Sequence, residues 1–182
     1  VCSHAATMVV EGRDARLDHC VLQQWGEGVG HVALHRTMLA QNARLRMFGA
    51  TLGSRLQKAY WEVMLDGPGA EANISGVVFG DGTHHLDHQS LQAHRAPQTT
   101  SRLKLKVAVR DHARSVYSGL IDVERVAQQT DAYVPNRNLL LSHGAPAASV
   151  PRPANPAHAL RAGPGAPPRP LRAVHRRPLV PP

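Results

Sequence analysis

The stretch SVYSGLIDVERVAQQTDAYVPNRNLLLS, from Ser115 to Ser142, decides the fold of this chain. It holds two short apolar segments, Val116 to Val123 and Asn138 to Leu141, which are separated by polar amides and a Pro-Asn turn. No apolar stripe with a 3.6-residue period runs through it, so the pattern predicts strand, turn and strand. The residues before this stretch continue the same pattern, whereas those after it have a different composition.

A short phrase in which a small Ala stands between polar residues recurs along the chain. Its five copies are centred on Ala15, Ala43, Ala70, Ala113 and Ala127. These alanines stand 28, 27, 43 and 14 residues apart, close to whole multiples of about 14, and a fixed period indicates a stacked repeat. Small residues suit the corners of such a stack, where little room is left for a side chain.

An alternation of period two follows four of these phrases and predicts half-buried strands. The alternating residues are Leu17, His19 and Val21; Leu45, Met47 and Gly49; Ile74, Gly76 and Val78; and Val116, Ser118 and Leu120. Short strands at a constant interval favour a β-solenoid, in which each turn buries its inner face against its neighbours. An antiparallel β-sandwich, which also has short strands at regular spacing, is the alternative.

Residues 34–56 contain many good helix formers, yet we predict strands there. Gly49 and Gly53 interrupt the segment, and its apolar residues hold no helical stripe. Tyr60 to Leu65 is predicted to be a strand that runs into the turn Asp66-Gly67-Pro68-Gly69.

The C-terminal end differs in composition from the rest of the chain. Of the net charge of +8, +7 comes from seven arginines that follow Ala132, and this region contains no Asp or Glu. Twelve of the fourteen prolines lie from Pro135 onward. We therefore predict a β-solenoid core over residues 1–142 and a disordered basic tail, rich in Pro, Ala and Arg, over 143–182. The tail is either genuine or an out-of-frame translation, and the protein sequence leaves both open.

A basic tail attracts phosphates, so a nucleic-acid-binding protein on a β-solenoid is one functional hypothesis. It is not favoured, because no aromatic residues interleave the arginines to stack on bases. The sequence shows no leader peptide and no apolar run near the ~18 residues of a membrane span. Cys2 and Cys20 lack C-x-x-C spacing. We therefore expect a cytoplasmic protein that makes no membrane contact.

The segment His84-His85-Leu86-Asp87-His88, with His94 beyond it, offers side chains that zinc or iron would use. On a strand, His84 and His88 share one face and His85 lies on the other, so only two ligands converge. We therefore expect these imidazoles and Asp87 to hydrogen-bond one another or the backbone, and we predict no metal ligand. A His-ligated metalloenzyme is the rival hypothesis.

No catalytic or cofactor-binding residue is predicted either. Neither G-x-S-x-G nor a Cys with a matched His and acid can be assembled, and no G-x-x-x-x-G-K-S/T loop is present. Gly26-Glu27-Gly28-Val29-Gly30 is rich in glycine but lacks dinucleotide-binding spacing, so we predict an exposed loop there. The chain is predicted not to be an enzyme.

Several segments between residues 80 and 142 carry a family resemblance. They are Leu86 to His94, Ala96-Pro97 with Thr100, Ser101 and Lys106, Ser115 to Ile121, Ala127 to Tyr133, and Asn136 to Ser142. Together they resemble the SufB/SufD family of iron–sulfur cluster assembly proteins, and SufD more than SufB. Gly12 to Leu17 and Leu65 to Val78 also resemble the SufD core, more loosely.

The resemblance implies a right-handed parallel β-helix and a non-catalytic scaffold subunit of the SUF complex, SufBCD. It implies pairing with a SufB-like subunit through the β-helix core, and with a SufC-like ATPase through a helical terminal region. It also implies that the complex handles the iron–sulfur cluster transiently and that this chain holds no cofactor firmly.

The sequence departs from the SufD pattern in its last part. SufD chains carry a Cys-Ser-His-Gly-Ala-Thr phrase beyond the Asn-Arg-Asn-Leu-Leu-Leu strand, and then a helical domain that docks SufC. Here Ser142-His143-Gly144-Ala145 lies directly at the strand end without the cysteine, and Cys2 to Thr7 lies at the wrong end of the core. We therefore assign no ligand to either phrase and expect an incomplete copy. A core that ends at Ser142 has an uncapped strand edge, which predicts poor solubility.

Overall fold

The computed structural model describes residues 1–142 and 147–154, the last six of them by backbone only. Within these residues the chain forms twelve strands and no helix. The strands are β1 (Cys2–Glu11), β2 (Arg16–Gln23), β3 (Gly30–Leu39), β4 (Arg44–Thr51), β5 (Leu56–Leu65), β6 (Glu71–Gly80), β7 (His85–His94), β8 (Thr100–Val109), β9 (Arg114–Val123), β10 (Asp131–Tyr133), β11 (Asn136–Leu140) and β12 (Ala147–Ala154).

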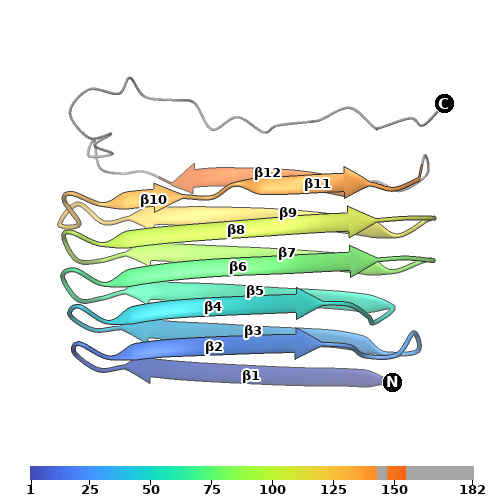
Figure 1. Ribbon diagram of the computed structural model, residues 1–182, viewed down its shortest axis with the longest axis horizontal. Helices are drawn as coiled ribbons and strands as arrows, with labels where there is room; N and C mark the ends of the chain where they lie inside the picture. The colour runs from blue at the N-terminus through green and yellow to red at the C-terminus, as the bar shows by residue number, and fades with distance from the viewer. Residues whose placement is uncertain (143–146, 155–182) are drawn as a thin grey trace.

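The strands form two parallel sheets that the chain visits in alternation. Sheet A holds β1, β3, β5, β7, β9 and β12 in that order, and sheet B holds β2, β4, β6, β8 and β10, with β11 also paired to β8. In Figure 1 the strands of the near sheet run to the right and those of the far sheet to the left while the chain rises, which is a right-handed coil. The predicted right-handed parallel β-helix is confirmed. The sandwich alternative is wrong, because its strands would pair antiparallel.

One turn of the β-helix takes two strands and two corners. In sheet A, Cys2 pairs with Gly30, Gly30 with Leu56, Leu56 with His85, and His85 with Arg114, so these four turns take 26 to 29 residues each. The predicted period of about 14 residues is therefore half a turn. Alternate half-turns belong to alternate sheets, which explains why both sheets are parallel although the chain reverses at every corner.

The corner before sheet B explains three of the five recurring alanines, whereas Ala113 precedes β9 of sheet A and Thr130 takes this corner position in the turn of Ala127. Ala15, Ala43 and Ala70 stack there, because the N–H of Arg44 donates to the carbonyl of Ala15 and that of Glu71 to the carbonyl of Ala43, both at 2.9 Å. The residue just before the small corner residue has a left-handed backbone, with φ between 57° and 72°, at Asp14, Asn42, Gly69, Gln98 and Gln129. Asp, Asn and Gly tolerate this conformation, so the corner itself selects for them.

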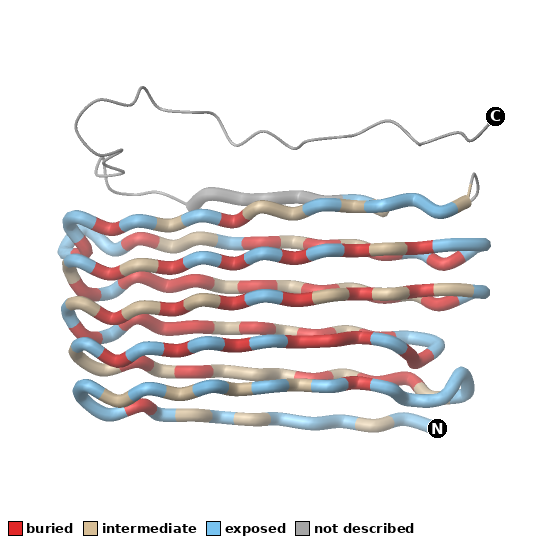
Figure 2. Tube along the Cα trace, in the orientation of Figure 1, coloured by how far each residue is buried: buried red, intermediate tan, exposed pale blue. Residues whose placement is uncertain are grey.

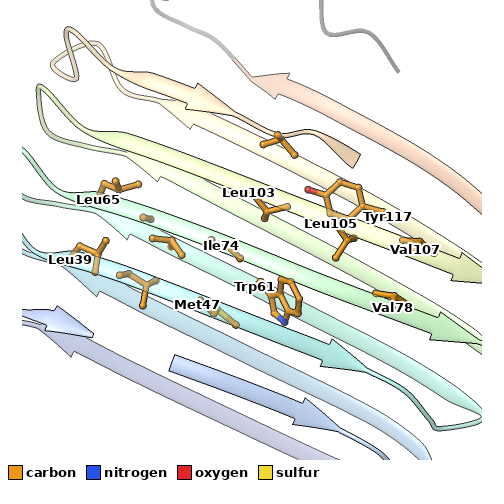
Figure 3. Close-up of a cluster of buried hydrophobic side chains, with 14 of the residues drawn as sticks. Leu39, Met47, Trp61, Leu65, Ile74, Val78, Leu103, Leu105, Val107 and Tyr117 are labelled. Atoms are coloured by element: carbon orange, nitrogen blue, oxygen red, sulfur yellow. The ribbon is translucent and has the colours of Figure 1, made fainter. Parts of the chain in front are cut away.

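The hydrophobic core lies between the two sheets from Leu39 onward. Buried and exposed residues alternate along most strands, whereas the first strand is mainly exposed (Figure 2). Trp61 lies at the centre of the cluster, flanked by the strands of sheet B (Figure 3). A Cβ atom on Gly76 would lie 2.7 Å from the Trp61 ring and 2.8 Å from Leu105. The indole therefore occupies space that only a glycine at this position leaves free.

The strand predictions are confirmed for residues 34–56, which belong to β3, β4 and β5, and for Tyr60 to Leu65, which ends β5. The alternation at Val116, Ser118 and Leu120 is one residue out of phase. The buried residues of β9 are Ser115, Tyr117, Gly119 and Val123, and a shift of one residue exchanges the two faces of a strand.

The predicted boundary after Ser142 also differs from the structure. Strand β12 lies inside the segment 143–182 that we expected to be disordered, and it pairs with β9 from Ala147 opposite Ser115 to Ala154 opposite Asp122. Its prolines, Pro151 and Pro153, are compatible with this place because β12 is the last strand of sheet A in the described residues. The rest of the expected tail, 143–146 and 155–182, lies outside the described residues.

Candidate functional site

The structure gives the histidines of residues 84–94 separate partners. His84 precedes β7, and its Nδ1 lies 3.3 Å from Oδ1 of Asp81. His85 begins β7, and the carboxylate of Asp87 lies 3.8 Å from the ammonium group of Lys58. In the described residues the expected hydrogen bonds from these imidazoles to Asp87 are not formed, but Nδ1 of His84 accepts a hydrogen bond from the backbone N–H of Asp81 at 3.5 Å, which agrees with the backbone alternative.

His88 lies inside the β-helix, on the inner face of β7. Its Nε2 lies 2.9 Å from the hydroxyl of Thr51 in the facing sheet, and its ring meets Trp61 edge-on at 5.7 Å between ring centroids. Nδ1 of His88 has no hydrogen-bond partner in the described residues. Burial lowers the pKa of His88 to about 4, so the imidazole is neutral at neutral pH.

His94 ends β7 in the corner before sheet B, where it is fully buried. Its Nδ1 lies 2.7 Å from the hydroxyl of Thr99, and its Nε2 lies 2.8 Å from that of Ser101. Thr99 also lies 3.2 Å from the hydroxyl of Thr130 in the next turn. Burial lowers the pKa of His94 to about 4, while the charge of Asp131 opposes this shift. A neutral imidazole with both nitrogens engaged in this way joins three segments of the corner and has no free lone pair for a metal.

The inner face of β7 is largely polar, which the sequence analysis did not predict. After Leu86, every second residue is buried and polar: His88, Ser90, Gln92 and His94. Ser90 shares a hydrogen bond of 2.8 Å with the hydroxyl of Tyr117 in the next turn. Hydroxyl and imidazole groups pair along this face, whereas Nδ1 of His88 and the side-chain amide of Gln92 have no hydrogen-bond partner in the described residues. They can hold strands in register, but none is paired as a nucleophile with a base and an acid.

A hollow of about 370 Å³ opens between the first turns of the two sheets. Its lining includes Gln23 and Gln57, whose amides are joined by a 2.9 Å hydrogen bond, and His31, whose ring lies 5.6 Å from that of Trp25. His35, also in the lining, meets His19 edge-on at 6.0 Å. The hollow therefore combines paired amides, imidazoles that meet other rings, and apolar side chains such as Trp25 and Trp61.

The remaining sequence candidates lie apart from one another. Cys2 on β1 and Cys20 on β2 are both exposed and belong to different sheets. The segment Gly26 to Gly30 forms the exposed loop that was predicted, with β3 beginning at its last residue. Across residues 1–142 and 147–154, no group of three or more His, Cys, Asp or Glu side chains is arranged to hold a metal ion. No helix in the described part of the chain is long and apolar enough to cross a membrane.

The most distinctive surface is the C-terminal edge of sheet B, which we define as β10, β11 and Leu141. No described strand pairs with the outer side of β10 or β11. Tyr133, Leu139 and Leu141 are each more than half exposed, at 56%, 53% and 51%. Leu140 pairs with Val109 on the core-facing side of the sheet yet is 44% exposed, since no described turn covers it. An open strand edge lined with apolar side chains is typical of a surface that another protein covers.

Comparison with known proteins identifies the family of this β-helix. Residues 2–166 match the family model described as "SUF system FeS cluster assembly, SufBD core domain". An iron-sulfur cluster assembly SufBD family protein of Mycobacterium leprae is 32% identical over 144 residues, which are 75% of this chain and 37% of that protein. One of Staphylococcus saprophyticus is 24% identical over 149 residues, or 81% of this chain and 32% of that protein.

This chain therefore spans only about a third of the length of these curated relatives. The family description and the names of these relatives refer to iron–sulfur cluster assembly, and none of them refers to nucleic acid. The family model covers nearly the whole β-helix, including β12. The chain belongs to the SufBD family of iron–sulfur cluster assembly proteins.

Proposed function

We propose that this chain is a non-catalytic scaffold subunit of a SUF complex of the SufBCD type, and that it pairs with a SufB-like subunit through the C-terminal edge of sheet B. Family membership supports a role in an assembly complex. The observation that carries the proposal is the open strand edge, where Tyr133, Leu139 and Leu141 stay exposed beside unpaired backbone groups. A strand from a partner of the same fold would continue sheet B and bury these side chains.

The non-catalytic role is supported by the chemistry of the interior. The buried histidines His88 and His94 are neutral and bonded to hydroxyl groups, which suits a structural role in which they hold strands together. The proposal includes a cluster that the complex handles transiently and a reducing cytoplasmic compartment, which both unpaired cysteines suit. A SufC-like ATPase is proposed to join only where the longer part of the relatives is present.

A pull-down with a SufB-like subunit tests the proposal. The full chain should retain the SufB-like subunit, and Leu139→Glu should abolish retention, because a charge buried in the edge contact would remain unpaired. Leu22→Glu is the matched control, since Leu22 is 63% exposed at the opposite end of sheet B. Loss of retention with both variants, or none with either, would contradict the proposed edge. A wild-type chain that retains no SufB-like subunit would overturn the scaffold role itself.

A further inference from the structure

The outer face of sheet B carries a cationic patch beside the C-terminal edge, formed by Lys104 and Lys106 of β8 and Arg137 of β11. All three side chains are exposed. Arg137 pairs with Lys106 in the strand register, so their Cα atoms are neighbours across the sheet. Lys104 stands two residues before Lys106, on the same face of the strand. The three positive charges are therefore neighbours on this face: Arg137 lies one strand across from Lys106, and Lys104 lies two residues along the same strand.

Three of the four other cations on the strands of sheet B lie beside carboxylates, Arg16 being the exception. Arg46 is ion-paired with Asp18, Arg44 lies 3.8 Å from Glu71, and Arg102 lies 3.5 Å from Asp131. None of the three patch residues forms an ion pair with any described residue. The sequence contains no Asp or Glu after Asp131, so no side chain in residues 132–182 can supply a carboxylate to the patch.

The surroundings of the patch are suited to a peptide. Exposed Tyr133 and Leu139 lie on the neighbouring strands β10 and β11, on the outer face with Arg137. The two lysines are about 6.6 Å apart along the strand, and Arg137 lies about 4.8 Å to the side. An extended segment that carries carboxylates at alternate positions has the same spacing, and its remaining side chains would cover the apolar neighbours.

We propose that the cationic patch binds an acidic, extended segment of a partner protein. The carboxylates would pair with Lys104, Lys106 and Arg137, and the apolar side chains would contact Tyr133 and Leu139. Phosphate backbones also seek cations, but Tyr133 is the only aromatic residue on the strands that carry the patch and its apolar border, and single-stranded nucleic acids use several stacking platforms. The proposal goes beyond the scaffold role, since it concerns charges on the outer face of the sheet, although Tyr133 and Leu139 also belong to the open edge.

Fluorescence anisotropy with the full chain tests this inference. The probe is a labelled ten-residue peptide with Glu at alternate positions and Val or Thr between them, and its partner probe has Gln in place of every Glu. The Glu peptide should bind and the Gln peptide should not. Binding should weaken steeply with salt, because exposed charges are screened beyond a Debye length of about 10 Å at 0.1 M.

Two double variants test whether binding depends on the cationic patch or on positive charge anywhere on the sheet. Lys104→Gln with Lys106→Gln should weaken binding of the Glu peptide about tenfold, as expected for the loss of two exposed ion pairs. Arg44→Gln with Arg46→Gln has the same spacing on β4 but removes cations that already have partners, so affinity should be unchanged. Circular dichroism confirms that each variant is folded.

Three results would overturn the inference: equal binding of the Glu and Gln peptides, equal weakening by both pairs of substitutions, or tighter binding of a ten-nucleotide oligothymidylate than of the Glu peptide. None of these readouts involves the SufB-like subunit. Loss of edge pairing in the Leu139→Glu variant and loss of peptide binding in the lysine variant are therefore distinguishable.

Discussion

Nε2 of His94 lies 2.8 Å from the hydroxyl oxygen of Ser101, and this hydrogen bond joins the end of β7 in sheet A to the start of β8 in sheet B. Because the corner is buried, the imidazole is held in its neutral form, with its pKa lowered to about 4. His88 is buried between the same sheets, and its pKa is also lowered to about 4. Two neutral histidines inside the β-helix make its stability depend on pH.

We predict that the free energy of unfolding falls as the pH is lowered from about 6.5, the ordinary pKa of histidine, toward 4. In that window the unfolded chain binds protons at His88 and His94 and the folded chain does not. Each group contributes a slope of about 1.4 kcal/mol per pH unit. Urea unfolding at several pH values measures this slope. His94→Gln should reduce this slope, and the remainder should come from His88 together with His31 and His35, whose pKa values burial also lowers.

Glu11 has the opposite effect on the pH dependence of stability, so its contribution must be separated from that of the histidines. Burial raises its pKa to about 7, so the folded chain binds this proton first, and acidification from pH 7 toward 4.5 adds stability. The measurement is therefore best made in a Glu11→Gln background. A slope in that background that does not respond to His94→Gln would contradict the assignment.

Tyr117→Phe should destabilise the β-helix by about 1 to 2 kcal/mol, because it leaves the buried hydroxyl of Ser90 without its partner. The two oxygens are 2.8 Å apart, and both residues are buried. Ser90→Ala together with Tyr117→Phe should cost less than the sum of the single substitutions, since no unpaired hydroxyl remains. Additive losses in a double-mutant cycle by urea unfolding would show that the hydrogen bond contributes nothing.

Gly76→Ala should destabilise the chain by about 1 to 3 kcal/mol through overpacking. The new methyl group would lie 2.7 Å from the Trp61 ring and 2.8 Å from Leu105, inside the main apolar cluster. Gly12→Ala is the control, because no atom lies within 4 Å of the position that its Cβ would take. Thermal unfolding of both variants should show a lower midpoint for Gly76→Ala only. Equal midpoints would mean that the indole moves aside at little cost.

The sequence predicts the architecture well because the corners leave a local signal. The spacing from Ala15 to Ala43 and Ala70 reflects one turn of the coil, and the residues before them, Asp14, Asn42 and Gly69, are those that adopt left-handed backbone most readily. Neither feature depends on contacts between distant residues, so both can be found by inspection of the chain.

The interior of β7 could not be predicted in the same way. The alternation of His88, Ser90 and Gln92 has the right period for one face of a strand, but polar alternation ordinarily indicates the solvent side. It becomes an inner face only because Thr51 and Tyr117, from other turns, supply hydroxyl partners. The buried face of β9 was predicted wrongly for the same reason, because polar Ser115 is buried and the more apolar Val116 is not. The cationic patch likewise depends on the register that sets Arg137 beside Lys106.

The open C-terminal edge predicts that the isolated chain self-associates. The outer side of β11, with which no described strand pairs, and the exposed side chains of Leu139 and Leu141 offer a template for a second copy. Size-exclusion chromatography with light scattering should show a mass that rises with protein concentration. Leu139→Lys with Leu141→Lys should restore a monomer, because like charges at the edge repel an incoming strand. Phe48→Lys removes an apolar side chain of 44% exposure on β4, within the sheet, and should leave the association unchanged. A wild-type chain that stays monomeric at all concentrations would contradict the prediction and would mean that this edge is covered.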